Sequence, residues 1–312
     1  MLDQKEMREV YCDCLIEAAR TDDSIVVLEA DLMNCIKTGA FKKAYPDRFF
    51  DVGIAEANMV GIAAGLAACG KKPFCSSFAP FMTRRSFDQI FISVAYSKLN
   101  VKMVGTDPGI SAELNGGTHM PFEDMGIMRS VPGMICVEPT DARQLRALMP
   151  QILACDKPLY LRLFRKQCQS VFDDNASFDL LRAATLRDGK DVTIVASGIM
   201  VSRALEAAQT LAAQGIDARV LNMFTWKPID EAALIAAATE TGAIVTAENH
   251  NVYDGLFSAV SEVVVRNRPV PMECVGVQDC FGEVGKMPYL SERFGLRTED
   301  IVAAAQRAVS RK

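Results

Sequence analysis

The chain is short of the features that mark several large classes of protein. Its 312 residues include only two histidines and one tryptophan, and its net charge is −5. No apolar stretch reaches the roughly 18–20 residues that a membrane helix needs, and the polar start MLDQKEMREV is unlike a signal peptide. No basic stripe suggests nucleic acid or an anionic membrane as a partner. We therefore expect an ordinary globular protein of the cytoplasm.

Motifs for bound metals and nucleotides are also missing. The ten cysteines form no C-x-x-C pair and lie mostly in apolar runs, where a free cysteine behaves as a small hydrophobic residue. No G-x-G-x-x-G follows a strand, and no G-x-x-x-x-G-K-[ST] occurs. Neither a disulfide framework, a metal site nor a dinucleotide site is expected.

What the chain does contain is a regular alternation of short apolar strands with helices. This pattern is typical of parallel sheets that are covered on both faces. We expect strands at 25–31, 49–54, 73–77, 101–106, 134–139, 158–164, 191–198, 217–223, 243–249 and 271–277. The polar stretch 169–190 interrupts the rhythm. The prediction is thus two α/β domains in series, at 1–168 and 191–312, joined by a linker at 169–190.

One acid stands out inside the small and apolar run 49-FFDVGIAEANMVGIAAGLAACG-70. Glu56 ends an expected strand and opens the helix predicted for 57–69. A carboxylate in the first turn of a helix is stabilised by the helix dipole. An acid in a desolvated pocket is, alternatively, suited to proton transfer. The local pattern leaves both interpretations open.

The two histidines both follow expected strands. His119 lies in the polar loop 114-LNGGTHMPFED-124, at the sheet edge where ligands bind in open α/β folds. An exposed loop histidine is the alternative there. His250, in 247-AENHNVYDG-255, is interpreted as a structural or interface residue.

Three motifs in order resemble one enzyme family. The runs 50-FDVGIAEANMVGIAAGLA-67, 76-SSFAPF-81 and 115-NGGTHMP-121 closely resemble the pyrimidine-binding half of transketolases and of deoxyxylulose-phosphate synthases. The resemblance continues through 134-MICVEPTDARQL-145 into the second domain. It implies a subunit that transfers a two-carbon ketol unit from a ketose to an aldose with thiamine diphosphate as the cofactor.

The same resemblance implies a partner. The family's Gly-Asp-Gly motif, which holds the metal and the diphosphate, does not occur in this sequence. The chain therefore resembles the C-terminal subunit of a split transketolase. An N-terminal subunit is expected to hold Mg²⁺ or Ca²⁺ and the diphosphate, with a homodimeric core giving a heterotetramer.

Residue roles carry over from matched positions. Glu56 matches the catalytic glutamate, which shares a proton with the pyrimidine nitrogen N1′. Phe78 and Phe81 match aromatic residues around that ring, and Asp31 matches an acid near the thiamine. His119 matches a histidine that bonds the oxygens of the donor.

The chain departs from the family at the residues that bind the far end of the donor, which is the end that carries the phosphate of a sugar phosphate. Arg8 and Arg165 match the two arginines that hold a sugar phosphate. Cys35, however, stands at a serine position, Asp107 at a histidine position and Asn115 at an acidic one. The tyrosine expected after Phe81 is absent, and Arg84 and Arg85 lie nearby. These departures favour a variant donor, such as another sugar phosphate or a sulfonated sugar, with Arg84 or Arg85 as an added anion contact.

Two alternatives remain at this point. A β-type E1 subunit of a 2-oxo-acid dehydrogenase has the same layout, although the Gly-Gly-Thr-His loop favours transketolase. A regulatory homologue without catalysis is the other, against which the joint presence of Glu56, Phe81 and His119 argues. The run 248-ENHNVYDGL-256 of the second domain is assigned to packing and dimerisation.

Overall fold

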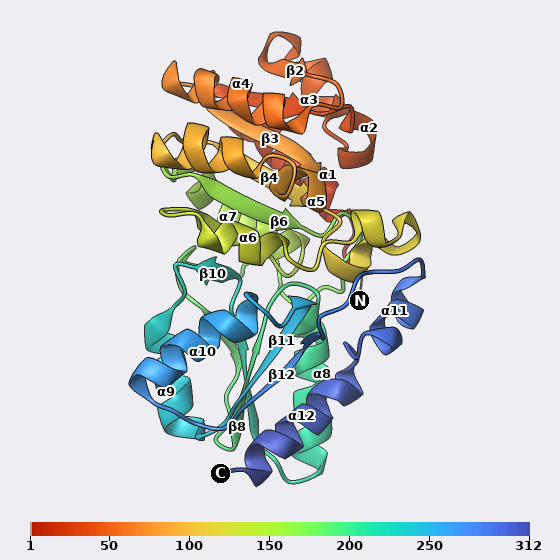
Figure 1. Ribbon diagram of the computed structural model, residues 1–312, viewed down its shortest axis with the longest axis vertical. Coiled ribbons are helices and arrows are strands. Elements are labelled where there is room, and N and C mark those ends of the chain that lie inside the picture. Colours follow the sequence, from red (N-terminus) through yellow and green to blue (C-terminus); the bar gives the residue numbers. More distant parts are fainter. Residues whose placement is uncertain (1) are drawn as a thin grey trace.

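Two α/β domains are stacked along the long axis of the molecule (Figure 1). The computed structural model describes residues 2–312. Each domain holds one mostly parallel sheet with helices on both faces. The predicted fold class is therefore confirmed.

The first domain is built on a seven-stranded sheet with the order β10-β5-β6-β4-β3-β1-β2. All neighbours run parallel except β10, which pairs antiparallel with β5. The strands are β1 (Ile25–Glu29), β2 (Phe49–Asp51), β3 (Lys72–Phe78), β4 (Lys102–Thr106), β5 (Ile135–Val137), β6 (Leu159–Leu163) and β10 (Thr225–Lys227). Strand β10 comes from the second half of the chain, and it forms an edge strand of the first domain's sheet by pairing with β5.

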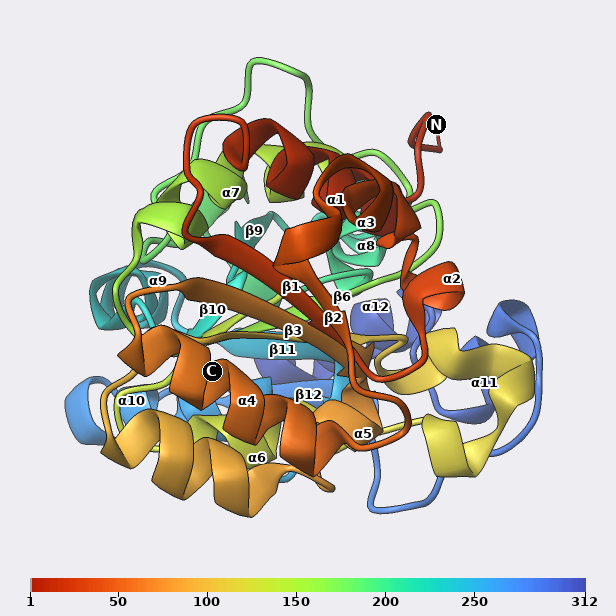
Figure 2. The ribbon, with the colours of Figure 1, turned by 90° about the horizontal axis from the view of Figure 1, so that it is seen from above.

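Helices cover both faces of this sheet (Figure 2). One face carries α1 (Met7–Ala18), α3 (Gly39–Ala44) and α7 (Ala142–Ala154), and the other carries α4 (Glu56–Ala68), the π-helical segment η2 (Gln89–Tyr96) and α6 (Asp124–Ser130). Alternate residues of β1 serve the two faces, because successive side chains of a strand point in opposite directions. Ile25 and Val27 belong to the core on the face covered by α1, α3 and α7, and Val26 and Leu28 belong to the core on the opposite face.

Short elements follow the carboxyl ends of β1, β3 and β4. They are α2 (Met33–Ile36), α5 (Ala79–Thr83), η3 (Gly109–Asn115) and η4 (Gly117–His119), whereas η1 (Pro46–Arg48) leads into β2. The carboxyl edge of a parallel sheet is the edge at which open α/β folds bind ligands. Four predicted site residues lie in these segments, namely Cys35, Phe81, Asn115 and His119.

The second domain holds a five-stranded sheet with the order β12-β11-β8-β9-β7. Its strands are β7 (Ala184–Arg187), β8 (Val192–Ala196), β9 (Ala218–Asn222), β11 (Ile244–Asn251) and β12 (Met272–Val277), and its helices are α8 (Met200–Ala213), α9 (Glu231–Thr241), α10 (Leu256–Asn267), α11 (Met287–Arg293) and α12 (Thr298–Ser310). Strand β7 lies within the stretch expected as a linker and pairs antiparallel with β9.

A buried ionic network joins the domains. Arg162, in the middle of β6, is fully buried. Its Nε and Nη2 donate to the two carboxylate oxygens of Asp124 at 2.8 and 2.9 Å, and its Nη1 donates to Glu138 at 2.6 Å. Nη2 also donates to the carbonyl of Asn249 at 2.9 Å, and Ser197 donates to Glu138 at 2.6 Å. Because every charge has a partner, the network fixes how the second domain sits on the first.

None of the helices between residues 2 and 312 combines the length and the apolar character that crossing a lipid bilayer requires.

Candidate active site

Glu56 is both a helix-start acid and a buried acid. It is the first residue of α4, and it is only 1% exposed. Ser77 Oγ donates to Oε1 at 3.3 Å, and Arg85 Nη1 donates to Oε2 at 2.7 Å. The buried face of α4 packs against the sheet, and the carboxylate is held below the surface with two polar contacts.

An aromatic wall lies beside this acid. Phe78 ends β3, Phe81 lies in α5 and His119 ends η4. The ring centroids of Phe81 and His119 are 5.0 Å apart, and those of Phe78 and His119 are 5.9 Å apart, both edge to face. The guanidinium carbon of Arg85 lies 4.3 Å from the centroid of Phe81. Glu56 and the three rings are thus neighbours through Arg85.

A charged cluster continues from the other side of Phe78. The guanidinium carbon of Arg165 lies 5.4 Å from the Phe78 centroid, and its Nη2 is 2.8 Å from Asp107 Oδ2. The backbone N–H of Arg8 donates to the Arg165 carbonyl at 3.4 Å, and the Arg8 side chain donates to the Cys35 carbonyl. The structure therefore brings together the four residues predicted for the far end of a donor.

Asp107 has unusual surroundings for a carboxylate. Its side chain is 1% exposed, and the ion pair with Arg165 lacks hydrogen-bond geometry. Both carboxylate oxygens and Arg165 Nε are consequently buried without a hydrogen-bond partner among residues 2–312. Burial raises the pKa of Asp107 to about 6, although Arg165 acts in the opposite direction. Buried polar groups of this kind are expected to meet a ligand or water.

Two predicted site residues lie apart from this cluster. Asp31 and Asn115 are exposed. The backbone N–H of Asp31 donates to Asp51 Oδ1 at 3.0 Å, and neither side chain forms a hydrogen bond with any part of residues 2–312. The two arginines named as added anion contacts have carboxylate partners, since Arg84 pairs with Glu123 at 3.1 Å and Arg85 pairs with Glu56.

The second domain supports the loop that carries His119, a role the sequence did not reveal. Asn249 Oδ1 accepts from the N–H of Ile110 at 2.9 Å, and its Nδ2 donates to the carbonyl of Pro108 at 3.0 Å. A Cβ at Gly109, whose φ is +55°, would collide with Asn249. Further along the loop, Glu113 accepts from the N–H of Met287 at 3.0 Å. The polar run 248–256, which begins within β11, was the available signal, but it was assigned to packing and dimerisation.

His250 is fully buried, in keeping with its predicted structural role. Its Nδ1 contacts the carbonyl of Asn251 at 2.7 Å. Burial, together with the charge of Arg162, lowers the pKa of His250 to about 4. The neighbouring Glu248 accepts from the N–H groups of Leu256 and Phe257 at 2.6 and 2.9 Å, and burial raises its pKa to about 8.

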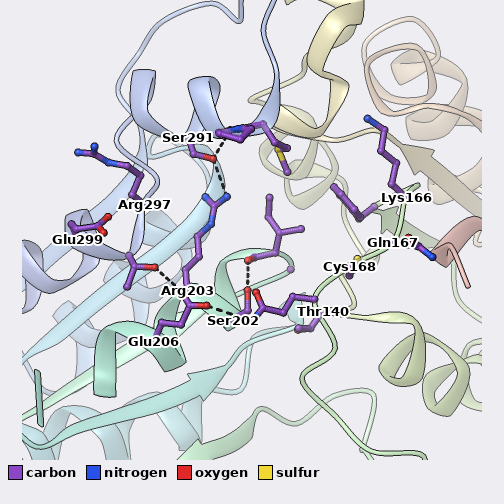
Figure 3. Close-up of a pocket in the computed structure, with 17 residues that line it drawn as sticks. Thr140, Lys166, Gln167, Cys168, Ser202, Arg203, Glu206, Ser291, Arg297 and Glu299 are labelled. Atoms are coloured by element: carbon purple, nitrogen blue, oxygen red, sulfur yellow. Dashed lines mark hydrogen bonds between the residues drawn. The ribbon is translucent and has the colours of Figure 1, made fainter. Parts of the chain in front are cut away.

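A separate cleft of about 570 Å³ lies between the domains (Figure 3). Several of its polar side chains are paired. Arg203 donates to Ser291 Oγ at 2.9 Å, Thr298 donates to Glu206 at 2.9 Å, and Lys166 pairs with Glu113 outside the lining. Glu56 and the aromatic wall are not among its lining residues. Within residues 2–312, no group of three or more histidine, cysteine, aspartate or glutamate side chains is arranged to hold a metal ion.

Comparisons with known proteins agree with this geometry. Residues 3–170 match the family model "Transketolase, pyrimidine binding domain", and residues 181–301 match "Transketolase, C-terminal domain". A 6-deoxy-6-sulfo-D-fructose transketolase subunit, SqwH, from Clostridium sp. strain MSTE9 is 55% identical over 100% of this chain and 97% of its own length. One subunit of the apulose-4-phosphate transketolase of Phocaeicola vulgatus is 39% identical over 96% of both chains.

A solved structure adds the three-dimensional match. It is described as a split-gene transketolase, an inactive β4 tetramer, and it superposes with a TM-score of 0.91 at 45% identity. The match covers 99% of this chain and 100% of that one. The likeness is thus one of whole subunits rather than of one shared domain. The protein belongs to the transketolase family, among the subunits that consist of its pyrimidine-binding and C-terminal domains.

Proposed function

We propose that this chain is the pyrimidine-binding subunit of a two-chain transketolase whose donor ketose ends in a sulfonate. A partner subunit supplies the metal and the site for the diphosphate of thiamine diphosphate, the cofactor that the family implies. The observation that carries the proposal is the buried carboxylate of Glu56 beside the wall formed by Phe78, Phe81 and His119.

This pocket fits the pyrimidine end of the cofactor. A flat heteroaromatic ring stacks well on a phenylalanine, and a buried carboxylate is a strong partner for a ring nitrogen. Glu56 holds a proton at N1′, while Phe78 and Phe81 exclude water from the ring. When bound, the cofactor supplies the nucleophilic carbon that takes up the two-carbon unit. Low polarity around Glu56 strengthens the one hydrogen bond on which activation depends.

His119 is suited to the oxygens of the donor. Its Nδ1 is 2.9 Å from Thr118 Oγ1, whereas Nε2 has no hydrogen-bond partner in the described part of the chain. The ring is held edge-on to Phe81, which limits its rotation. His119 can therefore direct Nε2 at a hydroxyl or carbonyl oxygen and orient the donor for cleavage of its carbon–carbon bond.

The charged cluster favours a singly charged end group over a doubly charged one. Each arginine already has a carboxylate partner, since Arg165 pairs with Asp107 at 2.8 Å and Arg8 pairs with Glu6 at 2.7 Å. A phosphate monoester carries up to two negative charges near neutral pH, because its second pKa is about 6. A sulfonate carries one. The Coulomb penalty of placing Asp107 beside a dianion is therefore the larger one.

Arg165 can act as a donor to the sulfonate. Its Nε is buried and has no hydrogen-bond partner in residues 2–312, so its N–H is available to a sulfonate oxygen. The 55% identical relative, whose name specifies a sulfonated fructose, supports the same end group.

The test is ketol transfer by this chain reconstituted with its diphosphate-binding partner. We expect a higher kcat/KM for 6-deoxy-6-sulfofructose than for fructose 6-phosphate. Asp107→Asn should raise the relative use of the phosphate about tenfold, a change of about 1.4 kcal/mol. Asp13→Asn, which removes a surface acid paired with Lys5, serves as the control. An unused sulfonated donor, or a ratio that Asp107→Asn does not alter, would contradict the proposal.

A further inference from the structure

We propose that Arg85 is a gate that occupies the pyrimidine pocket until the cofactor displaces it. This inference rests on the proposed function of the pocket and adds a role for a residue that the family motifs did not identify. Arg85 lies on the turn between α5 and η2 and reaches inward from the surface. Its side chain is 45% exposed, whereas that of its partner Glu56 is 2% exposed.

The guanidinium makes the two contacts that a pyrimidine ring also needs. It donates from Nη1 to Glu56 Oε2 at 2.7 Å, and its carbon lies 4.3 Å from the centroid of Phe81. Guanidinium groups stack on aromatic faces as flat heteroaromatic rings do. The ring and the arginine therefore compete for the same carboxylate and the same aromatic surface.

The competition has a physical reason. Without Arg85, the buried carboxylate of Glu56 would keep only the hydrogen bond from Ser77, which is destabilising for a buried charge. Arg85 supplies the missing cation in the free chain. Its half-exposed side chain and its position on a turn allow it to swing out without unfolding the helices on either side. The same contact that stabilises the empty subunit therefore opposes cofactor binding.

The adjacent arginine provides a matched control. Arg84 is also 45% exposed, but its Nε pairs with Glu123 at 3.1 Å and it makes no contact with Glu56. Changing either arginine to glutamine removes one positive charge from the same turn. A general electrostatic effect on the diphosphate would therefore appear equally in both variants. A change in cofactor binding that is confined to Arg85→Gln would instead show that the competing contact with Glu56 has been removed.

Two measurements with opposite expected signs test the gate. Titration of thiamine diphosphate into the reconstituted complex should give a Kd about fivefold lower for Arg85→Gln than for the wild type. This factor corresponds to the free energy of one partly exposed ion pair. Thermal unfolding of the chain alone should show a Tm about 2 °C lower for this variant. Arg84→Gln, which also removes the hydrogen bond from Nη2 to the carbonyl of Thr118 at 3.4 Å, should leave the Kd of the cofactor unchanged. A residue with a merely structural role would weaken binding and lower Tm together.

The outcomes separate this inference from the proposed function. If the wild-type complex binds the cofactor and Arg85→Gln binds it equally or more weakly, the gate is wrong and the pocket assignment stands. If the wild-type complex does not bind the cofactor, both are wrong. Should Arg85→Gln fail to fold, the double variant Glu56→Gln, Arg85→Gln removes both charges, and its Tm should match that of Glu56→Gln alone. A further fall in the double variant would overturn the pairing.

Discussion

Arginine–carboxylate groups occur in two regions of this molecule, and they differ in how completely they are satisfied. At the domain interface, Arg162 is fully buried and binds both oxygens of Asp124, one oxygen of Glu138 and a backbone carbonyl. In the candidate active site, Arg85 and Arg165 each make one carboxylate contact, and they are 45% and 15% exposed.

The difference distinguishes structure from binding. A buried network that leaves no atom unpaired stabilises one arrangement of the chain and offers nothing to a ligand. The pair of Asp107 and Arg165 instead leaves buried oxygens and an N–H without partners in residues 2–312. The pair of Glu56 and Arg85 can open toward solvent. Incomplete pairing therefore marks the groups that are available to a ligand.

The largest effect should come from breaking the satisfied network. Arg162→Met leaves Asp124 and Glu138 buried without their cation, so we expect the free energy of unfolding to fall by about 3–5 kcal/mol. Chemical denaturation of the chain, followed by far-UV circular dichroism, measures this change. A loss below about 1 kcal/mol would mean that the network does not hold the domains together.

A smaller loss should follow at the support of the His119 loop. Asn249→Ala leaves the N–H of Ile110 and the carbonyl of Pro108 without their partners, which costs about 1–3 kcal/mol of stability. Because the loop carries His119, the KM for the donor ketose should rise several-fold while the Kd of the cofactor is unchanged. Steady-state kinetics and cofactor titration of the reconstituted complex separate the two. Equal weakening of both would show that Asn249 supports the whole site and not the loop alone.

The pH dependence of stability offers a third test at the domain interface. Glu248 has a folded pKa of about 8, above its ordinary value near 4.5, so the folded state binds more protons between these values and loses stability as the pH rises. His250, with a pKa of about 4 against an ordinary 6.5, acts in the opposite direction only below pH 6.5.

Lys102, with a pKa lowered by burial to about 8, also opposes Glu248 as the pH approaches 8. Between pH 6.5 and 7.5, Glu248 should therefore dominate. We expect the free energy of unfolding to fall by about 1 kcal/mol per pH unit in this window, and Glu248→Gln should flatten the slope. Denaturant unfolding at four pH values measures it. An equally steep slope in the variant would assign the titration to another group.

The smallest effect should come from an exposed pair outside both regions. Arg146 contacts Glu17 at 3.2 Å on the surface, with the two side chains 46% and 57% exposed. Arg146→Met should change the free energy of unfolding by less than about 0.5 kcal/mol. The same denaturation assay that is used for Arg162→Met makes the comparison direct, and a loss above about 1 kcal/mol would show that burial does not separate the two classes of pair.

Much of the fold could be predicted from the sequence because strand and helix periods are local. The alternation of short apolar strands with helices predicted both sheets. Strand β10 could not be foreseen, since Thr225–Lys227 pairs with β5 across about 90 residues of chain. Strand β7 was hidden in a polar stretch, because an edge strand needs few apolar residues.

Candidate site residues could be proposed from the sequence where a motif combined chemistry with position. Glu56 stood alone among apolar residues, and His119 followed a strand in a glycine-rich loop. Asn249 gave no such signal, because its partners near residue 110 are about 140 residues away in sequence. The contact of Arg85 with Glu56 depends on how a turn and a helix meet. Side-chain pairing across elements follows from packing, which periodicity does not encode.

The central claim is that Glu56 is the proton-holding acid of a pyrimidine site completed by a partner subunit. Its most direct test is ketol transfer by the complex reconstituted with Glu56→Gln, alongside sedimentation to confirm assembly. Loss of the titratable oxygen should reduce kcat at least about 100-fold while the complex still forms. A kcat within twofold of the wild type would contradict the account, because the pocket would then have no need of its buried carboxylate.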